Sequence, residues 1–131
     1  MMILAYWFLL IAALMPYGLV QLARGKNFDN SKPRDTYANA EGLQKRAYNA
    51  HLNSLEVFPF YAVAVMVALL SGFEGWILNV LAGGWILLRG AYIYAYLKDM
   101  PKPRSMVWAA GMLVCILIIT MPLWAPYPEL F

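Results

Sequence analysis

The sequence predicts an all-α integral membrane protein, a single domain over residues 1–131 built as a bundle of four transmembrane helices. Hydrophobic residues make up 63% of the chain. Charged residues make up only 13%, about half of the share usual in a soluble domain. Apolar segments long enough to cross a hydrocarbon core alternate with polar stretches. Aromatic residues near the segment ends suit the belts that membrane proteins place at the interface: Trp76, Trp108, Trp124 and Tyr127.

The first expected helix covers residues 3–23, and the longest polar stretch of the chain, residues 24–44, follows it. The helix has neither the basic start nor the small-residue cleavage site of a removed signal peptide, and we expect Pro16 to kink it. We expect the polar stretch to be a loop with a short helix around residues 37–44. Loops of this length in compact domains are typically functional.

The second expected helix, residues 43–71, is polar in its first half and apolar in its second half, with no turn signal between them. The apolar half is too short to cross a hydrocarbon core alone, so part of the polar half should lie within the membrane, shielded by protein. A glycine-bearing turn then leads into the third helix, residues 76–97. The fourth helix is expected at residues 105–124, where prolines end it.

The basic residues predict an orientation. All of them except Arg89 lie in the first loop, in the third loop, or at the adjoining helix ends. The positive-inside rule therefore places these two loops in the cytoplasm and both termini on the opposite side. Basic residues at segment ends are not a nucleic-acid footprint. The single Cys115 excludes an intrachain disulfide and is interpreted as a small buried or lipid-facing hydrophobe, and no Cys/His set has metal-ligand spacing.

Two helices carry polar side chains at helical spacing, at the same membrane level. On the second helix the spacing i, i+3, i+7 and i+10 puts a cation, two amides and a carboxylate within roughly 80° of one another: Arg46, Asn49, Asn53 and Glu56. On the third helix the spacing i, i+3 and i+7 unites Arg89, Tyr92 and Tyr96. Arg104 begins the fourth helix at that level. Charged groups at such depth usually face a bundle interior or a watery cavity.

These residues also have plainer interpretations. Arg89 would form an ion pair with Glu56, which leaves room for a site beside it. Arg104 would be a topology determinant or would stand beside an anionic ligand, and the two tyrosines would be interfacial aromatics. His51 points away from the polar face and is interpreted as a packing or loop-contact residue.

Arginine, asparagine and tyrosine at one level suit a ligand with carboxylates and amides, while the bilayer supplies an apolar second substrate. Four helices alone would leave much of this polar surface facing lipid. We therefore expect an oligomer with the second helix at its centre and the site between subunits.

At these residues the chain resembles the MAPEG family, the membrane-associated proteins in eicosanoid and glutathione metabolism. The resemblance rests on four apolar segments with a long first loop, on Asn53-x-x-Glu56-x-Phe-Pro after an arginine, and on Arg89-x-x-Tyr92-x-x-x-Tyr96. A basic residue, Arg104, follows at the start of the fourth helix. The resemblance implies a homotrimer of the bacterial type in the inner membrane, with glutathione between adjacent subunits near the cytoplasmic face.

The resemblance also implies residue roles. Arg104 would be the catalytic residue that stabilises the glutathione thiolate. The implied glutathione-binding residues come from the first three helices: Arg24, Arg46, Asn53, Glu56, Arg89, Tyr92 and Tyr96. Asn49 stands where many catalytic members carry arginine, so one positive charge of the family pattern is missing here.

The leading hypothesis is a glutathione-dependent transferase or peroxidase that acts on a lipophilic electrophile, with glutathione as co-substrate. A thiol with a pKa of about 8.5 is only a few per cent ionised at neutral pH, and an arginine that lowers it by about one unit raises the thiolate fraction nearly tenfold. The alternative is a non-catalytic lipid- or glutathione-binding membrane protein, which Asn49 favours. A small transporter or structural subunit is a third possibility, but inverted repeats and paired broken helices are missing from the sequence.

Overall fold

The computed structural model describes residues 2–127, with side chains described from Leu4 onward, and this range is helical apart from its turns and loops. Six helices follow one another: α1 (Met2–Arg24), α2 (Pro33–Ala38), α3 (Gly42–Leu70), α4 (Trp76–Leu97), α5 (Pro101–Ile119) and α6 (Met121–Trp124). The four long helices, α1, α3, α4 and α5, are each long and apolar enough to cross a membrane. The chain is therefore an all-α membrane protein, and the predicted fold class is confirmed.

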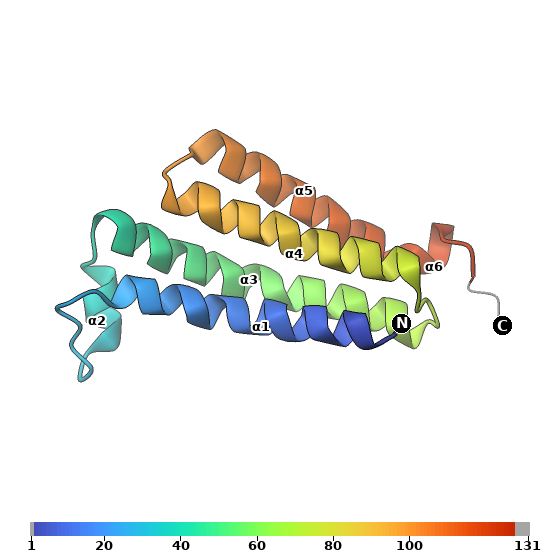
Figure 1. Cartoon of the computed structure of the whole chain (residues 1–131), viewed down its shortest axis with the longest axis horizontal. Coiled ribbons are helices and arrows are strands. Elements are labelled where there is room, and N and C mark those ends of the chain that lie inside the picture. The colour runs from blue at the N-terminus through green and yellow to red at the C-terminus, as the bar shows by residue number, and fades with distance from the viewer. Residues whose placement is uncertain (1, 128–131) are drawn as a thin grey trace.

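The four long helices are arranged as two pairs. α1 packs along α3 and α4 packs along α5, and α4 also contacts both α1 and α3 (Figure 1). The polar loop with α2 and the short α4–α5 loop lie at one end of the bundle, whereas the α3–α4 turn, the N-terminal end of α1 and α6 lie at the other end (Figure 1). The two basic loops thus share one end, which we call the loop end. That this end is cytoplasmic stays a prediction.

Prolines explain where the helix boundaries differ from the sequence expectation. The short helix of the polar loop is Pro33–Ala38 rather than residues 37–44, because proline fits the first helical turn, where its missing N–H is not needed. For the same reason α5 begins at Pro101, four residues before the expected Ser105. It ends at Ile119 because Pro122 cannot continue an α-helix, and the short α6 follows.

Turns at both ends of α3 have a clear physical basis. Gly72 in the α3–α4 turn has φ of +82°, a left-handed conformation that favours glycine. In the polar loop, the backbone N–H and the hydroxyl of Ser31 donate to Oδ1 of Asp29 at 2.9 and 2.6 Å. These hydrogen bonds, led by that of the hydroxyl, hold the pKa of Asp29 below its usual value. The loop therefore has a defined conformation that its own hydrogen bonds stabilise.

A column of aromatic rings joins the polar loop to α3. Phe28 lies 5.6 Å from Tyr37, Tyr37 stacks 4.9 Å from Tyr48, and Tyr48 lies 6.1 Å from His51, measured between ring centroids. Nδ1 of His51 donates to the carbonyl oxygen of Pro16 on α1 at 2.6 Å. The aromatic column thus holds the loop against α3, and the hydrogen bond of His51 holds α3 against α1. The interpretation of His51 as a packing residue is confirmed.

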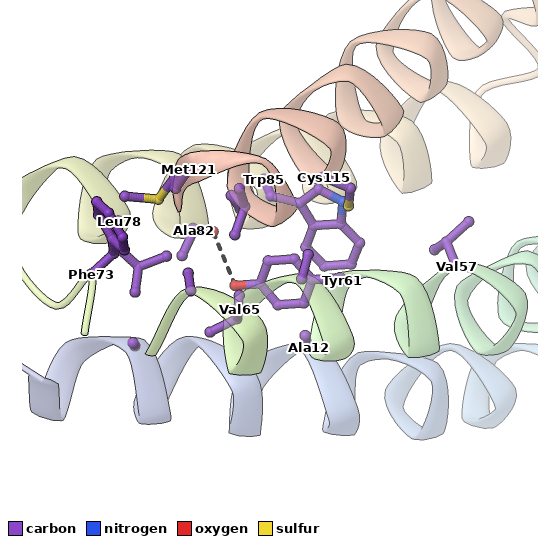
Figure 2. Packing of buried hydrophobic residues seen from close by; sticks show 14 residues of the cluster. Ala12, Val57, Tyr61, Val65, Phe73, Leu78, Ala82, Trp85, Cys115 and Met121 are labelled. Carbon is purple, nitrogen blue, oxygen red and sulfur yellow. Dashed lines mark hydrogen bonds between the residues drawn. The ribbon is translucent and has the colours of Figure 1, made fainter. Parts of the chain in front are cut away.

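The apolar core lies between α1, α3, α4 and α5, with an aromatic pair at its centre. Tyr61 of α3 stacks on Trp85 of α4 with 3.9 Å between ring centroids, and its hydroxyl donates to the carbonyl oxygen of Ala82 at 3.2 Å (Figure 2). Cys115 of α5 is buried beside Trp85 (Figure 2), so its interpretation as a small hydrophobe is confirmed. This pair sets the distance between α3 and α4 in the apolar core, farther from the loop end than the polar residues.

Removal of the Tyr61 hydroxyl should destabilise the fold modestly. We expect Tyr61→Phe to lower the free energy of unfolding by about 1 kcal/mol, because a buried hydrogen bond is lost while the ring stack is kept. Tyr94→Phe, at a tyrosine that is 61% exposed, should change it by less than about 0.5 kcal/mol. Denaturant unfolding of the detergent-solubilised variants measures both, and equal effects would contradict the assignment.

Candidate functional site

The centre of the loop-end polar cluster is Arg89 of α4, which is 3% exposed. Its guanidinium donates to two residues of α3, to Oδ1 of Asn53 at 3.1 Å and to Oγ of Ser54 at 3.0 Å. The Ser54 hydroxyl in turn donates to the carbonyl oxygen of Ala50 at 2.9 Å. The buried cation is therefore held by neutral oxygens across the α3–α4 contact.

The ion pair expected between Arg89 and Glu56 is wrong. Within the described part of the chain, the guanidinium takes the Asn53 and Ser54 oxygens instead, and Glu56 is exposed. The reason is the rotation of α3, which turns Ser54 toward α4. Since successive residues lie about 100° apart on a helix, Glu56 lies about 200° from Ser54 around α3 and is exposed.

Aromatic rings continue the cluster from Arg89 to α5. The guanidinium carbon of Arg89 lies 4.2 Å from the ring centroid of Tyr92, and Tyr92 meets Tyr96 edge to face at 5.7 Å. The guanidinium carbon of Arg104 lies 4.5 Å from the ring centroid of Tyr96. Such cation–π contacts hold a cation and a ring together while leaving the N–H groups free to bond elsewhere. A continuous set of contacts therefore runs from α3 through α4 to α5.

A pocket of about 240 Å³ lies beside this set of contacts. Residues of α3, α4 and α5 line it: Asn53, Tyr92, Tyr96, Arg104, Ser105 and Trp108. Tyr96 belongs to the last turn of α4 and Arg104 lies one turn into α5, so the pocket is at the loop end. Its walls combine one fixed cation, phenol and hydroxyl groups, an amide and an indole. Such a set of donors suits an anionic ligand that carries an apolar portion.

The structure brings four of the residues selected from the sequence together around this pocket: Asn53, Tyr92, Tyr96 and Arg104. The other four do not line it in the single chain. Arg24 is exposed with its guanidinium carbon 4.7 Å from the ring centroid of Phe28, and Glu56 is exposed. Arg46 donates through Nε to the carbonyl oxygen of Leu97 at 3.1 Å, which caps the end of α4. Arg89 lies behind the pocket wall.

Three residues of the site were not selected from the sequence: Ser54, Ser105 and Trp108. Trp108 follows Arg104 by four positions, a spacing that puts both on one helix face, so the signal was present although Trp108 was interpreted as a belt aromatic. Ser105 adjoins Arg104 without any distinguishing pattern. Ser54 neighbours Asn53, and only the rotation of α3 shows that both face Arg89.

Four apolar helices and a polar, arginine-bearing pocket at one end define an α-helical integral membrane protein. The model of the MAPEG family matches residues 1–124, nearly the whole chain, so the protein belongs to the MAPEG family. Searches of curated proteins and of solved structures found no significant match.

The cap that Arg46 places on α4 can be tested against a neighbouring cation. We expect Arg46→Met to speed amide hydrogen exchange in residues 94–100, because the last turn of α4 loses its side-chain donor. Lys45→Met is the matched control, since Nζ of Lys45 donates to the carbonyl oxygen of Ala38 on α2 at 3.0 Å. It should affect residues near Ala38 instead. Exchange mass spectrometry distinguishes the two patterns, and the same pattern in both variants would contradict the assignment.

Proposed function

We propose that the protein is a glutathione-dependent transferase or peroxidase that acts on a lipophilic electrophile at the membrane. The observation that carries the proposal is the pocket at the junction of α3, α4 and α5, into which Arg104, two phenols and an amide converge. Membership of the MAPEG family supports a glutathione-related role. The cation and the donors are suited to the carboxylates and peptide carbonyls of glutathione, and to its sulfur when it is ionised.

The proposed chemistry depends on the thiolate of glutathione. In conjugation, the thiolate sulfur forms a bond to an electrophilic carbon and a leaving group departs with its electron pair. In peroxide reduction, the sulfur attacks one oxygen of the O–O bond, which breaks and releases an alkoxide that takes up a proton to become an alcohol. The sulfenic acid of glutathione formed in this way reacts with the thiol of a second glutathione to give the disulfide and water. Arg104 favours the ionised sulfur, and a decrease of about one unit in the thiol pKa corresponds to about 1.4 kcal/mol.

The lipophilic substrate is proposed to arrive from the bilayer along α5. Trp108 lines the pocket and is also 39% exposed, and Met106 on the same helix is 71% exposed. In a membrane these side chains would meet lipid tails. An apolar molecule dissolved there would therefore reach the pocket wall at Trp108 without leaving an apolar environment.

We further propose that the protein is a homotrimer and that a neighbouring subunit completes the site. The pocket of about 240 Å³ is smaller than the roughly 300–1,000 Å³ usual for small-molecule sites. α3 also exposes an apolar stripe at helical spacing: Leu52, Pro59, Val63, Met66 and Leu70. Glu56 lies within this stripe, and a carboxylate facing lipid would be costly. A second copy that covers the stripe would shield Glu56 and bring it, with Arg24 and Arg46, toward a shared site.

The proposal places the loop end, and with it the pocket, on the cytoplasmic side of a bacterial inner membrane. The support is the distribution of the basic residues, which lie in the polar loop, in the α4–α5 loop and at adjoining helix ends. The positive-inside rule retains such loops in the cytoplasm. Glutathione would then enter from the aqueous phase and the second substrate from the lipid.

Replacement of Arg104 tests the thiolate role. We expect Arg104→Ala to reduce turnover at neutral pH about tenfold, because loss of the cation raises the pKa of the bound thiol by about one unit. The rising limb of the pH–rate profile should move to higher pH by the same amount, and the rates should converge where the thiol is fully ionised. Assays with glutathione and an aryl halide or a lipid hydroperoxide measure both effects.

The matched control is Lys102→Ala, which removes a cation from the first turn of α5 without touching the pocket. Its profile should not move. An unchanged profile in Arg104→Ala would contradict the assignment of this residue. Binding of glutathione by calorimetry without turnover of either electrophile would instead identify the alternative, a non-catalytic binding protein, which Asn49 in the position of a family arginine favours.

The oligomer can be tested on the exposed stripe of α3. Native mass spectrometry should detect a complex of three 14.8-kDa chains in the wild type. Val63→Trp, in the centre of the stripe, should shift the population toward smaller species, because overpacking of an interface is destabilising. Val80→Trp on α4, where the valine is also exposed, is the control and should leave the trimer intact. A monomeric wild type would rule out the shared site.

A further inference from the structure

Asn53 lines the pocket, and a side-chain amide can present either its oxygen or its nitrogen to a ligand. The choice reverses the chemistry of the wall, because the oxygen accepts hydrogen bonds and the NH₂ group donates them. The bonding partners of the amide decide which of the two atoms faces the ligand. For Asn53 the deciding partner is Arg89, whose guanidinium carries donors and no acceptor.

We propose that Arg89 is a positioning residue, which does not touch the ligand but fixes the Asn53 amide so that it donates into the pocket. Oδ1 of Asn53 accepts from Arg89 at 3.1 Å, and this bond commits the oxygen to the α3–α4 contact. The NH₂ group lies in the same amide plane but points away from Arg89, which leaves it to donate into the pocket that Asn53 lines. The resemblance to the family placed Arg89 among residues that contact glutathione, whereas the geometry gives it an indirect role.

Arg89 is held too firmly by the protein to serve the ligand itself. It is 3% exposed and is not part of the pocket wall. Its second terminal nitrogen donates to Oγ of Ser54 at 3.0 Å, and the Ser54 hydroxyl is itself fixed because it donates to the carbonyl oxygen of Ala50. The side-chain oxygens of Asn53 and Ser54, adjacent residues of α3, thus accept hydrogen bonds from the two terminal nitrogens of the planar guanidinium. These two bonds define its orientation.

The same guanidinium supports a second wall of the pocket. Its carbon lies 4.2 Å from the ring centroid of Tyr92, so one buried group holds a pocket residue on α3 by a hydrogen bond and one on α4 by a cation–π contact. Asn53 then offers a donor, and Arg104, which also lines the pocket, is a donor as well. A ligand group that contacts both must be an acceptor, such as a carboxylate or a peptide carbonyl. This assignment rests on the proposed function. The group at that position is then an oxygen of glutathione rather than its ammonium group.

The first test observes the Asn53 amide directly and needs no ligand. In protein labelled with ¹⁵N-asparagine, the side-chain signal of Asn53 is the one that Asn53→Leu removes. We expect an ordered NH₂ group in the wild type and a mobile one in Arg89→Met. Ser54→Ala, which leaves the bond between Arg89 and Asn53 in place, is the control and should leave the signal more ordered than in Arg89→Met. A signal that is equally ordered in Arg89→Met, or mobile in the wild type, would overturn the proposal.

The second test is a double-mutant cycle for glutathione affinity, measured by calorimetry on the solubilised protein. Arg89→Met should weaken binding about tenfold, the equivalent of one hydrogen bond to a charged ligand. In the Asn53→Leu background the same change should weaken binding less than threefold, because the hydrogen-bonded target is gone and only the contact with Tyr92 remains to be lost. Equal losses in both backgrounds would mean that Arg89 acts independently of Asn53 and would overturn the proposal.

Together the two tests distinguish the failure of this inference from the failure of the proposed function. If the wild type binds no glutathione, the proposed function is wrong, and the amide signals still decide whether Arg89 orients Asn53. If glutathione binds and the order of the Asn53 amide does not change in Arg89→Met, the proposed glutathione site stands and the positioning role is wrong.

Discussion

The loop end depends on a single buried cation, the guanidinium of Arg89. A charge at this depth is tolerated only when its donors are satisfied, and here an amide and a hydroxyl of α3 satisfy them. These bonds join α3 to α4 at the level of the pocket, while the Tyr61–Trp85 stack joins the same helices deeper in the apolar core. Two contacts of different chemistry thus fix the spacing and the rotation of α3 against α4. This arrangement determines the positions of the pocket residues Asn53 and Tyr92.

Helical periodicity explains how much of this site was accessible from the sequence. Spacings of three and four residues unite Tyr92 with Tyr96 on one face, and hydropathy places Asn53 and Arg104 at the same depth, so a shared pocket could be predicted. The four spans were predicted for the same reason, since an apolar segment of this length has few other stable arrangements. Their exact limits depended on where prolines begin a helix rather than end one, as at Pro101.

What the sequence could not supply was the rotation of one helix against another. Glu56 and Ser54 are two residues apart, and either could have faced Arg89; a difference of about 200° around α3 separates them. Packing selects Ser54, because small residues such as Ala50 are turned toward the neighbouring helices and are fully buried. The sequence also did not show which atoms the long side chains would contact. Arg46 was selected as a ligand-binding residue, yet its Nε donates a hydrogen bond to the carbonyl oxygen of Leu97.

Trp108 belongs at once to the wall of the pocket and to the outer surface of α5. For a substrate that enters past this indole, the relevant concentration is its mole fraction in the lipid or detergent phase, which depends on its partition coefficient. Apparent Michaelis constants expressed per volume of solution would then rise as more detergent dilutes the substrate within the micelles. Comparisons among substrates of different hydrophobicity would report their partitioning together with their fit to the pocket.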